Sequence, residues 1–138
     1  MLAAISHLNW LSVLTASVAH FMLGGIWFAV LFGKHYATAL GIAHNPVSKP
    51  KAIFFIGPLI CSSMNIVTTA FLMRALYITT YNDALALGAI IGFGYLAPMT
   101  VNIAINPLFP RPFYYAMINV PMFVVGSLMS SAILLMMS

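Results

Sequence analysis

The stretch NWLSVLTASVAHFMLGGIWFAVL, residues 9–31, decides the fold of this chain. It contains no Asp, Glu, Lys or Arg, and its first basic neighbour, Lys34, follows only after the stretch ends. A transmembrane helix needs about 20 mostly apolar residues, so the stretch is long enough to cross a bilayer. His20 lies near its centre, and the pair Gly24-Gly25 interrupts its second half. The stretch therefore predicts a membrane-spanning helix with unusual residues at and beyond its midpoint.

Three later runs have the same apolar character, and charged or turn-forming residues separate them. These runs are residues 52–76, 84–106 and 113–137. Lipid offers no partner for backbone N–H and C=O groups, so each run must be an α-helix. The sequence predicts an all-α fold, a polytopic bundle of four transmembrane helices that forms one integral membrane domain over residues 1–138. For residues 34–41 it allows either a short interfacial helix ended by Gly41 or an irregular loop.

The composition excludes a water-soluble domain. Hydrophobic residues make up 63% of the chain and charged residues only 4%, against about 25% charged residues in soluble proteins. The formal charge of +4 is scattered along the chain, so we expect membrane lipid as a partner and no nucleic acid. Cys61 is the single cysteine and cannot form an internal disulfide.

The basic residues predict how the chain is oriented. Lys34, Lys49 and Lys51 lie in the first loop and Arg111 in the third, whereas the opposite side carries only Arg74. Loops rich in Lys and Arg stay in the cytoplasm. We therefore expect both termini outside the cytoplasm, in a protein of the bacterial inner membrane.

Each expected helix carries one stripe of small or polar residues at helical spacing. The stripes are Ser12, Ala16, His20, Gly24 and Trp27; Ser62, Asn65 and Thr69; Gly88, Gly92, Tyr95, Met99, Asn102 and Asn106; and Asn119, Phe123, Gly126 and Ser130. Such residues commonly join helices in membranes, and they can also line a cavity. The candidate cavity or ligand residues are His20, Gly24, Trp27, Asn65, Asn102, Asn106 and Asn119.

Helix-weakening residues fall at one depth. Pro58, Pro98 and Pro121 lie roughly 9–12 Å from the expected cytoplasmic ends of their helices, at a rise of 1.5 Å per residue. Gly25 falls at the same level on the first helix. Because proline frees the carbonyl four residues earlier, these four residues are a candidate hinge layer. Proline and glycine are common in membrane helices, so a coincidence is the alternative.

Titratable groups are scarce in the predicted spans. His20 is the only one deep in the membrane, and we expect it to bond a neighbour such as Asn65 rather than to carry a charge. No pair of histidines has metal-ligand spacing, and Asp83, the only acid, lies in a loop. We therefore expect no metal, no cofactor and no catalytic residue.

Short motifs along nearly the full length resemble a known family. They are Asn9-Trp10-Leu11, Gly24-Gly25-Ile26-Trp27-Phe28, Leu31-Phe32-Gly33-Lys34, Asn106-Pro107-Leu108-Phe109 and Arg111-Pro112. Together they resemble the DUF1761 family of four-helix bacterial integral membrane proteins. The resemblance implies the same fold and assigns no catalytic residue. The chain departs from the pattern at Pro110, where an acid is common, and Asn119 is an amide at a position that holds an acid or an amide.

Two functions remain open after these observations. The first is a channel or transport module for a small solute, with a neutral polar lining in the cytoplasmic half. The alternative is a non-catalytic structural, accessory or lipid-binding membrane subunit. A membrane enzyme or cofactor binder that uses His20 ranks last, because the chain offers few titratable groups. We also expect a homo-oligomer, with a dimer as the default, and an unidentified small-molecule ligand.

Overall fold

The computed structural model describes residues 7–42 and 51–138, and this part of the chain contains helices and no strand. The elements are α1 (Trp10–Gly25), the π-helix η2 (Ile26–Leu31), α2 (Gly33–Leu40), α3 (Ile53–Ala75), α4 (Tyr81–Ala89), the π-helix η3 (Ile90–Leu96), α5 (Ala97–Ala104) and α6 (Pro112–Met136). Four continuous helices are long and apolar enough to cross a membrane: Trp10–Leu31, Ile53–Ala75, Tyr81–Ala104 and Pro112–Met136. The predicted all-α fold with four transmembrane helices is confirmed.

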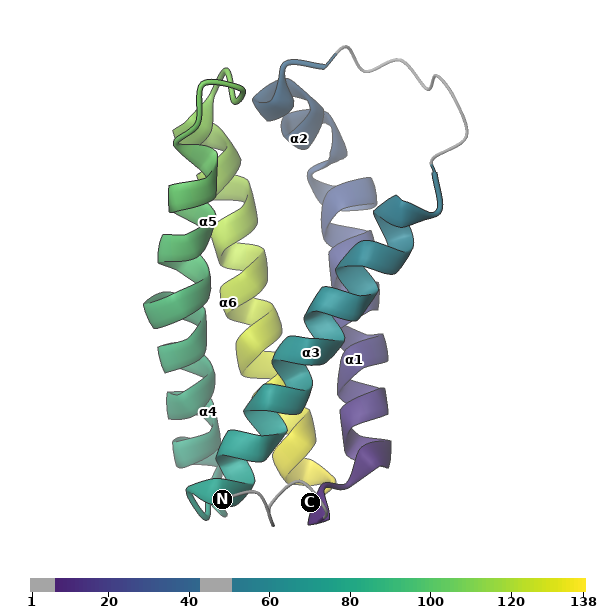
Figure 1. The fold of residues 1–138 in the computed structure, drawn as a ribbon, viewed down its shortest axis with the longest axis vertical. Coiled ribbons are helices and arrows are strands. Elements are labelled where there is room, and N and C mark those ends of the chain that lie inside the picture. The colour runs from purple at the N-terminus through teal and green to yellow at the C-terminus, as the bar shows by residue number, and fades with distance from the viewer. Residues whose placement is uncertain (1–6, 43–50) are drawn as a thin grey trace.

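Helix α6 is the centre of the bundle. It contacts α1, α2, α3, α4, η3 and α5. Figure 1 shows α4 and α5 running beside α6, while α3 crosses the bundle diagonally next to α1 and diverges from α5. The buried residues of α6 are accordingly numerous, whereas α3 buries only four. The first half of α3 therefore has little helix packed against it.

The two ends of the bundle differ in charge. We call the end with α2, Lys51 and Arg111 the Lys34 end, at the top of Figure 1, and the other the Arg74 end. Residues 7 and 138 both lie at the Arg74 end, where the side-chain amide of Asn9 donates to the carbonyl of Met137 at 2.6 Å. Which end faces the cytoplasm stays a prediction.

The apolar core occupies the half of the bundle nearer the Arg74 end. Its buried members are Leu8, Val13, Ala16, Ile66, Ala70, Met73, Ala84, Leu87 and Leu134. Helix α4 approaches α6 closely here, because Gly88 has no side chain. A Cβ atom at Gly88 would lie 3.1 Å from Leu128 Cα. The hydroxyl of Ser127 donates to the carbonyl of Gly88 at 2.8 Å and joins the two helices.

The third span begins earlier than the sequence predicts. The predicted run begins at residue 84, but α4 begins at Tyr81 because Thr80 is its N-cap. Thr80 Oγ1 accepts from the Asp83 N–H at 3.2 Å and donates to Asp83 Oδ2 at 2.7 Å. The only acidic side chain of the protein thus accepts from the N-cap residue and lies in the first turn, where its negative charge interacts favourably with the positive end of the helix dipole. The same span ends at Ala104 rather than at residue 106.

The π-helix η3 turns the second half of the third span. The N–H of Ala97 donates to the carbonyl of Gly92, five residues earlier. Pro98 has no N–H, so it cannot donate to the carbonyl of Gly94 as an α-helix would require. An extra residue in a turn rotates everything after it by about 100° relative to an α-helix. The inward face therefore advances in steps of four: Gly88, Gly92, Leu96, Thr100 and Ala104.

This rotation makes the predicted stripe of the third span wrong beyond Gly92. Tyr95 is 70% exposed and Met99 59% exposed, and Asn102 is exposed as well. Thr100 and Ala104 are buried in their place.

The backbone of the first span also changes from an α-helix to a π-helix. The π-helix η2 starts directly after Gly25, and the N–H of Phe32 bonds the carbonyl of Trp27, again five residues earlier. Residues 34–41 include most of α2, which Gly41 ends with a left-handed φ of 69°. A Cβ atom at Gly41 would also lie 2.8 Å from Pro110 Cγ. Both the positive φ and this close contact therefore favour glycine at the position. The interfacial location of α2 stays a prediction.

Candidate functional site

A cavity of about 750 Å³ lies in the half of the bundle nearer the Lys34 end. Its walls come from α1 and η2, α2, α3, η3 and α6, where α3 diverges from the other helices (Figure 1). The residues that line it are His20, Phe21, Gly24, Gly25, Phe28, Ala29, Tyr36, Ile53, Phe54, Phe55, Pro58, Cys61, Ser62, Asn65, Ile66, Thr69, Ile91, Leu96, Tyr115, Asn119, Met122, Phe123, Ser127 and Ser130. Small-molecule sites typically measure about 300–1,000 Å³. The cavity therefore has the size of a ligand site.

The deep end of the cavity is polar. His20 Nδ1 lies 3.3 Å from Ser130 Oγ, and both side chains are buried. The ring of His20 rests on Gly126, where a Cβ atom would lie 2.5 Å from Cε1. The expected partner Asn65 was wrong: the turn of α6 that presents Gly126 and Ser130 makes room for the ring and supplies the hydroxyl.

Most polar groups of this floor are bonded to nearby backbone. Thr69 Oγ1 donates to the carbonyl of Asn65 at 2.8 Å, and Asn119 Nδ2 donates to that of Tyr115 at 2.8 Å. The side chain of Asn65 and the Oδ1 atom of Asn119 have no hydrogen-bond partner among residues 7–42 and 51–138. Among the amide groups of the floor, the Asn65 side chain and Asn119 Oδ1 therefore remain available to a ligand.

The part of the cavity nearest the Lys34 end, which we call its mouth, is mostly aromatic. The Phe28 and Tyr36 rings lie 4.9 Å apart between centroids, and the Tyr36 and Tyr115 rings 5.8 Å apart. Burial, with a smaller contribution from Tyr115, raises the pKa of Tyr36 to about 12. The Tyr36 phenol therefore stays protonated at neutral pH. Phe54 and Phe55 of α3 complete the mouth.

The structure brings together some of the predicted site residues and separates others. His20, Gly24, Asn65 and Asn119 line the cavity, and the hinge candidates Gly25 and Pro58 do so too. The remaining candidates, which are not among its lining residues, are Trp27, Asn102, Asn106, Pro98 and Pro121. What any of these residues does stays a prediction.

The outlying candidates have other contacts. Trp27 Nε1 donates to the carbonyl of Ile118 at 3.0 Å and so attaches η2 to α6. Asn106 Oδ1 accepts from the N–H of Leu108 at 2.9 Å and stabilises the turn after α5. Asn102 faces outward because of the rotation at η3.

The residues of the candidate hinge layer differ in the backbone hydrogen bonding around them. The π-helix η2 begins immediately after Gly25, and η3 ends two residues before Pro98. Pro58 and Pro121 instead lie inside α3 and α6, which remain α-helical around them. Changed backbone hydrogen bonding therefore occurs in two of the helices that carry the layer.

Sequence reasoning missed the aromatic mouth. Nothing in the sequence distinguishes Phe28, Phe54 and Phe55 from phenylalanines that face lipid. Ser127 was not predicted as a lining residue, although its neighbour Gly126 was assigned to the polar stripe of the last helix. Only the positions of the helices in space bring these side chains to one cavity.

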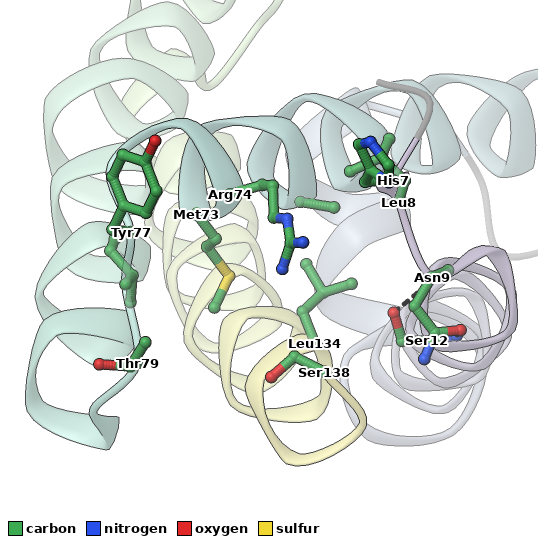
Figure 2. Close-up of a pocket in the computed structure, with 12 residues that line it drawn as sticks. His7, Leu8, Asn9, Ser12, Met73, Arg74, Tyr77, Thr79, Leu134 and Ser138 are labelled. Carbon is green, nitrogen blue, oxygen red and sulfur yellow. Dashed lines mark hydrogen bonds between the residues drawn. The ribbon is translucent and has the colours of Figure 1, made fainter. Parts of the chain in front are cut away.

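A smaller recess of about 240 Å³ opens at the Arg74 end. Figure 2 shows it between the start of α1, the end of α3 and the end of α6, with the Arg74 side chain directed into the space over α6. On α1, Ser12 lines the recess and His20 the cavity, and fully buried Ala16 lies between them. Ala16 belongs to the apolar core, which closes the bundle between the two openings.

The family comparison agrees with the sequence motifs. A family model described as a protein of unknown function, DUF1761, matches residues 11–135. No curated protein and no solved structure matches the chain. The predicted resemblance is therefore confirmed over most of the chain.

Proposed function

The chain belongs to the DUF1761 family, and from its cavity we propose that it is a transport module for a small uncharged solute. The observation that carries the proposal is the cavity of about 750 Å³ with a neutral polar floor. A recess of about 240 Å³ at the opposite end provides a second opening. The two openings lie at opposite ends of a packed apolar core, and passage of solute by alternating access would need this core to open.

The cavity lining explains why the solute is uncharged. No Asp, Glu, Lys or Arg is among the lining residues. An ion that left water for this cavity would lose its hydration without meeting an opposite charge, which is costly in a membrane. The asparagine amides and the serine hydroxyls offer hydrogen bonds to a neutral molecule instead.

The proposal includes an orientation. The Lys34 end carries Lys34, Lys51 and Arg111, so the positive-inside rule puts it in the cytoplasm of a bacterial inner membrane. The cavity would then open to the cytoplasm, and the Arg74 recess and both termini to the outside.

One observation favours the alternative, an accessory or lipid-binding subunit. The first half of α3 has few helix contacts, and Ile56 and Ile60, which do not line the cavity, are both more than half exposed. Such a surface fits another membrane protein or lipid. This alternative predicts ligand or partner binding without movement of solute across the membrane.

Solute flux separates the two functions. We expect vesicles that contain the purified protein to release at least one of urea, glycerol and nicotinamide faster than protein-free vesicles. Cys61→Phe fills a cavity wall and should slow this release. Ile60→Phe, at the neighbouring α3 position outside the cavity lining, should not. Release no faster than from protein-free vesicles for all three solutes would contradict transport and leave the binding function.

A further inference from the structure

The polarity of the cavity runs opposite to that of a phospholipid. Its polar groups gather around His20 and Asn65, each near the middle of its span, whereas most of its aromatic residues lie nearer the mouth; Phe21 and Phe123, at the depth of His20, are the exceptions. A phospholipid puts its headgroup at the membrane surface and its apolar chains at the midplane. An acyl chain in this cavity would cover the free amide of Asn65 without bonding it, and an unbonded buried polar group is costly.

We infer that the cavity binds a compact uncharged molecule with a flat apolar body and one hydrogen-bonding end, and that this end enters first. The inference rests on the proposed function in taking the cavity as the solute site, and it specifies the class of solute. The ligand is neither a phospholipid nor a simple polyol.

The hydrogen-bonding end is defined by the two available amides. Asn65 offers both a donor and an acceptor, and Asn119 offers Oδ1, because its Nδ2 atom is bonded to Tyr115. A ligand group that both donates and accepts, such as a carboxamide or a hydroxyl, can bond either side chain. A group of either charge would be desolvated there without a counter-charge.

The apolar body is defined by the mouth. Phe28 and Tyr36 pack at 4.9 Å with an interplanar angle of 53°, and Phe54 and Phe55 belong to the opposite wall. Aromatic rings favour stacked or edge-on contact with another flat ring. They also attract cations, so a cationic ligand of the same shape is a necessary comparison.

Cys61 is the only cysteine of the chain and lines the cavity, so its reactivity reports occupancy without any substitution. The experiment follows the rate at which N-ethylmaleimide modifies Cys61 in reconstituted protein. Five probes are compared: 2-naphthamide, 2-naphthoate, 2-naphthylmethylammonium, naphthalene and acetamide. They vary the charge, the polar end and the flat body one at a time.

We expect 2-naphthamide to slow the modification about threefold at twice its Kd, where one third of the sites remain free. The other four probes should change the rate much less at the same concentration. Asn65→Leu should weaken the protection by 2-naphthamide. A control with Ile60→Cys in a Cys61→Ser background puts the thiol beside the original position but outside the cavity lining, and no probe should slow its modification.

Each contrary result overturns a different part of the inference. Equal protection by either charged probe contradicts an uncharged ligand, and equal protection by naphthalene contradicts a polar end in the floor. Equal protection by acetamide contradicts the flat body, and no protection by any probe contradicts the ligand class altogether. Solute release without protection leaves transport standing and removes this ligand class. Protection without release removes transport and keeps the ligand class for a binding protein.

Discussion

At the scale of single residues, the contact between His20 and Gly126 shapes the floor of the cavity. The imidazole occupies the space that any side chain at position 126 would need, and Ser130 bonds its Nδ1 atom. The titratable group deepest in the membrane is thus held by a glycine and a hydroxyl on one face of α6. The position of the His20 ring therefore depends on its packing against Gly126 as well as on its hydrogen bond.

Gly126→Ala should destabilise the protein by about 1–3 kcal/mol, because the new methyl group would displace the His20 ring from a packed site. Gly57→Ala is the matched control, since a Cβ atom there meets nothing within 4 Å. Alanine at position 57 should leave stability unchanged or raise it by up to about 1 kcal/mol, since alanine favours helices over glycine. Unfolding in mixed detergent, followed by circular dichroism, measures both. Equal stability of the two variants would contradict the assigned contact.

Tyr36 makes stability depend on pH in the alkaline range. Its pKa is about 12 in the folded protein, mainly because the side chain is buried, against about 10 for an ordinary tyrosine. Between these values the folded chain holds the proton more tightly than the unfolded chain, so stability falls as pH rises from 10 to 12. We expect Tyr36→Phe to reduce this fall in Tm, and Tyr77→Phe, at an 87% exposed position, to leave it unchanged. A fall unaltered by Tyr36→Phe would contradict the burial of this phenol.

At the scale of elements, the two π-helices decide which faces turn inward. The sequence predicts the four spans to within a few residues, because length and hydropathy are local properties. The sequence does not show that η3 inserts an extra residue into one turn. The predicted stripe of the third span therefore follows the outward face of the helix after Gly92. Asn102 was assigned inward for this reason, whereas Asn65 and Asn119 line the cavity on helices that stay α-helical.

The rotation at η3 gives a paired prediction for two asparagines. Asn119→Leu should destabilise the protein by about 1–3 kcal/mol, because it removes the buried hydrogen bond to the Tyr115 carbonyl. Asn102→Leu should change stability by about 0.5 kcal/mol or less, because this side chain is exposed and unbonded among the described residues. Unfolding curves of the two variants test this difference. The reverse order would show that α5 presents Asn102 to the interior.

At the scale of the whole molecule, the two halves of the bundle are packed unequally. The core from Leu8 to Leu134 packs the Arg74 half, and the divergence of α3 opens the Lys34 half. The sequence could not predict this asymmetry, because the crossing of α3 depends on how α1 and α6 pack against each other. It also could not predict the aromatic mouth, which the same divergence creates.

The homodimer stays a prediction, and the weakly packed half of α3 is the surface at which we test it. A partner copy against Ile56 would cover apolar surface that the monomer leaves exposed. We expect Ile56→Cys, in the Cys61→Ser background, to form a disulfide-linked dimer under oxidising conditions in membranes. Val30→Cys in the same background is the control, at an exposed site on η2. Equal crosslinking at both sites would contradict an interface on α3.

The measurement that tests the central claim most directly is the sidedness of Cys61 labelling in sealed bacterial membrane vesicles. The reagent is a membrane-impermeant maleimide with its charged group on a flexible chain, since Cys61 lies about 12 Å from the start of α3 at 1.5 Å per residue. A cavity that opens to the cytoplasm predicts rapid labelling in inside-out vesicles and little in right-side-out vesicles. The Ile60→Cys, Cys61→Ser control should react slowly in both. Labelling of Cys61 from the outside, or no faster than the control from either side, would contradict the account.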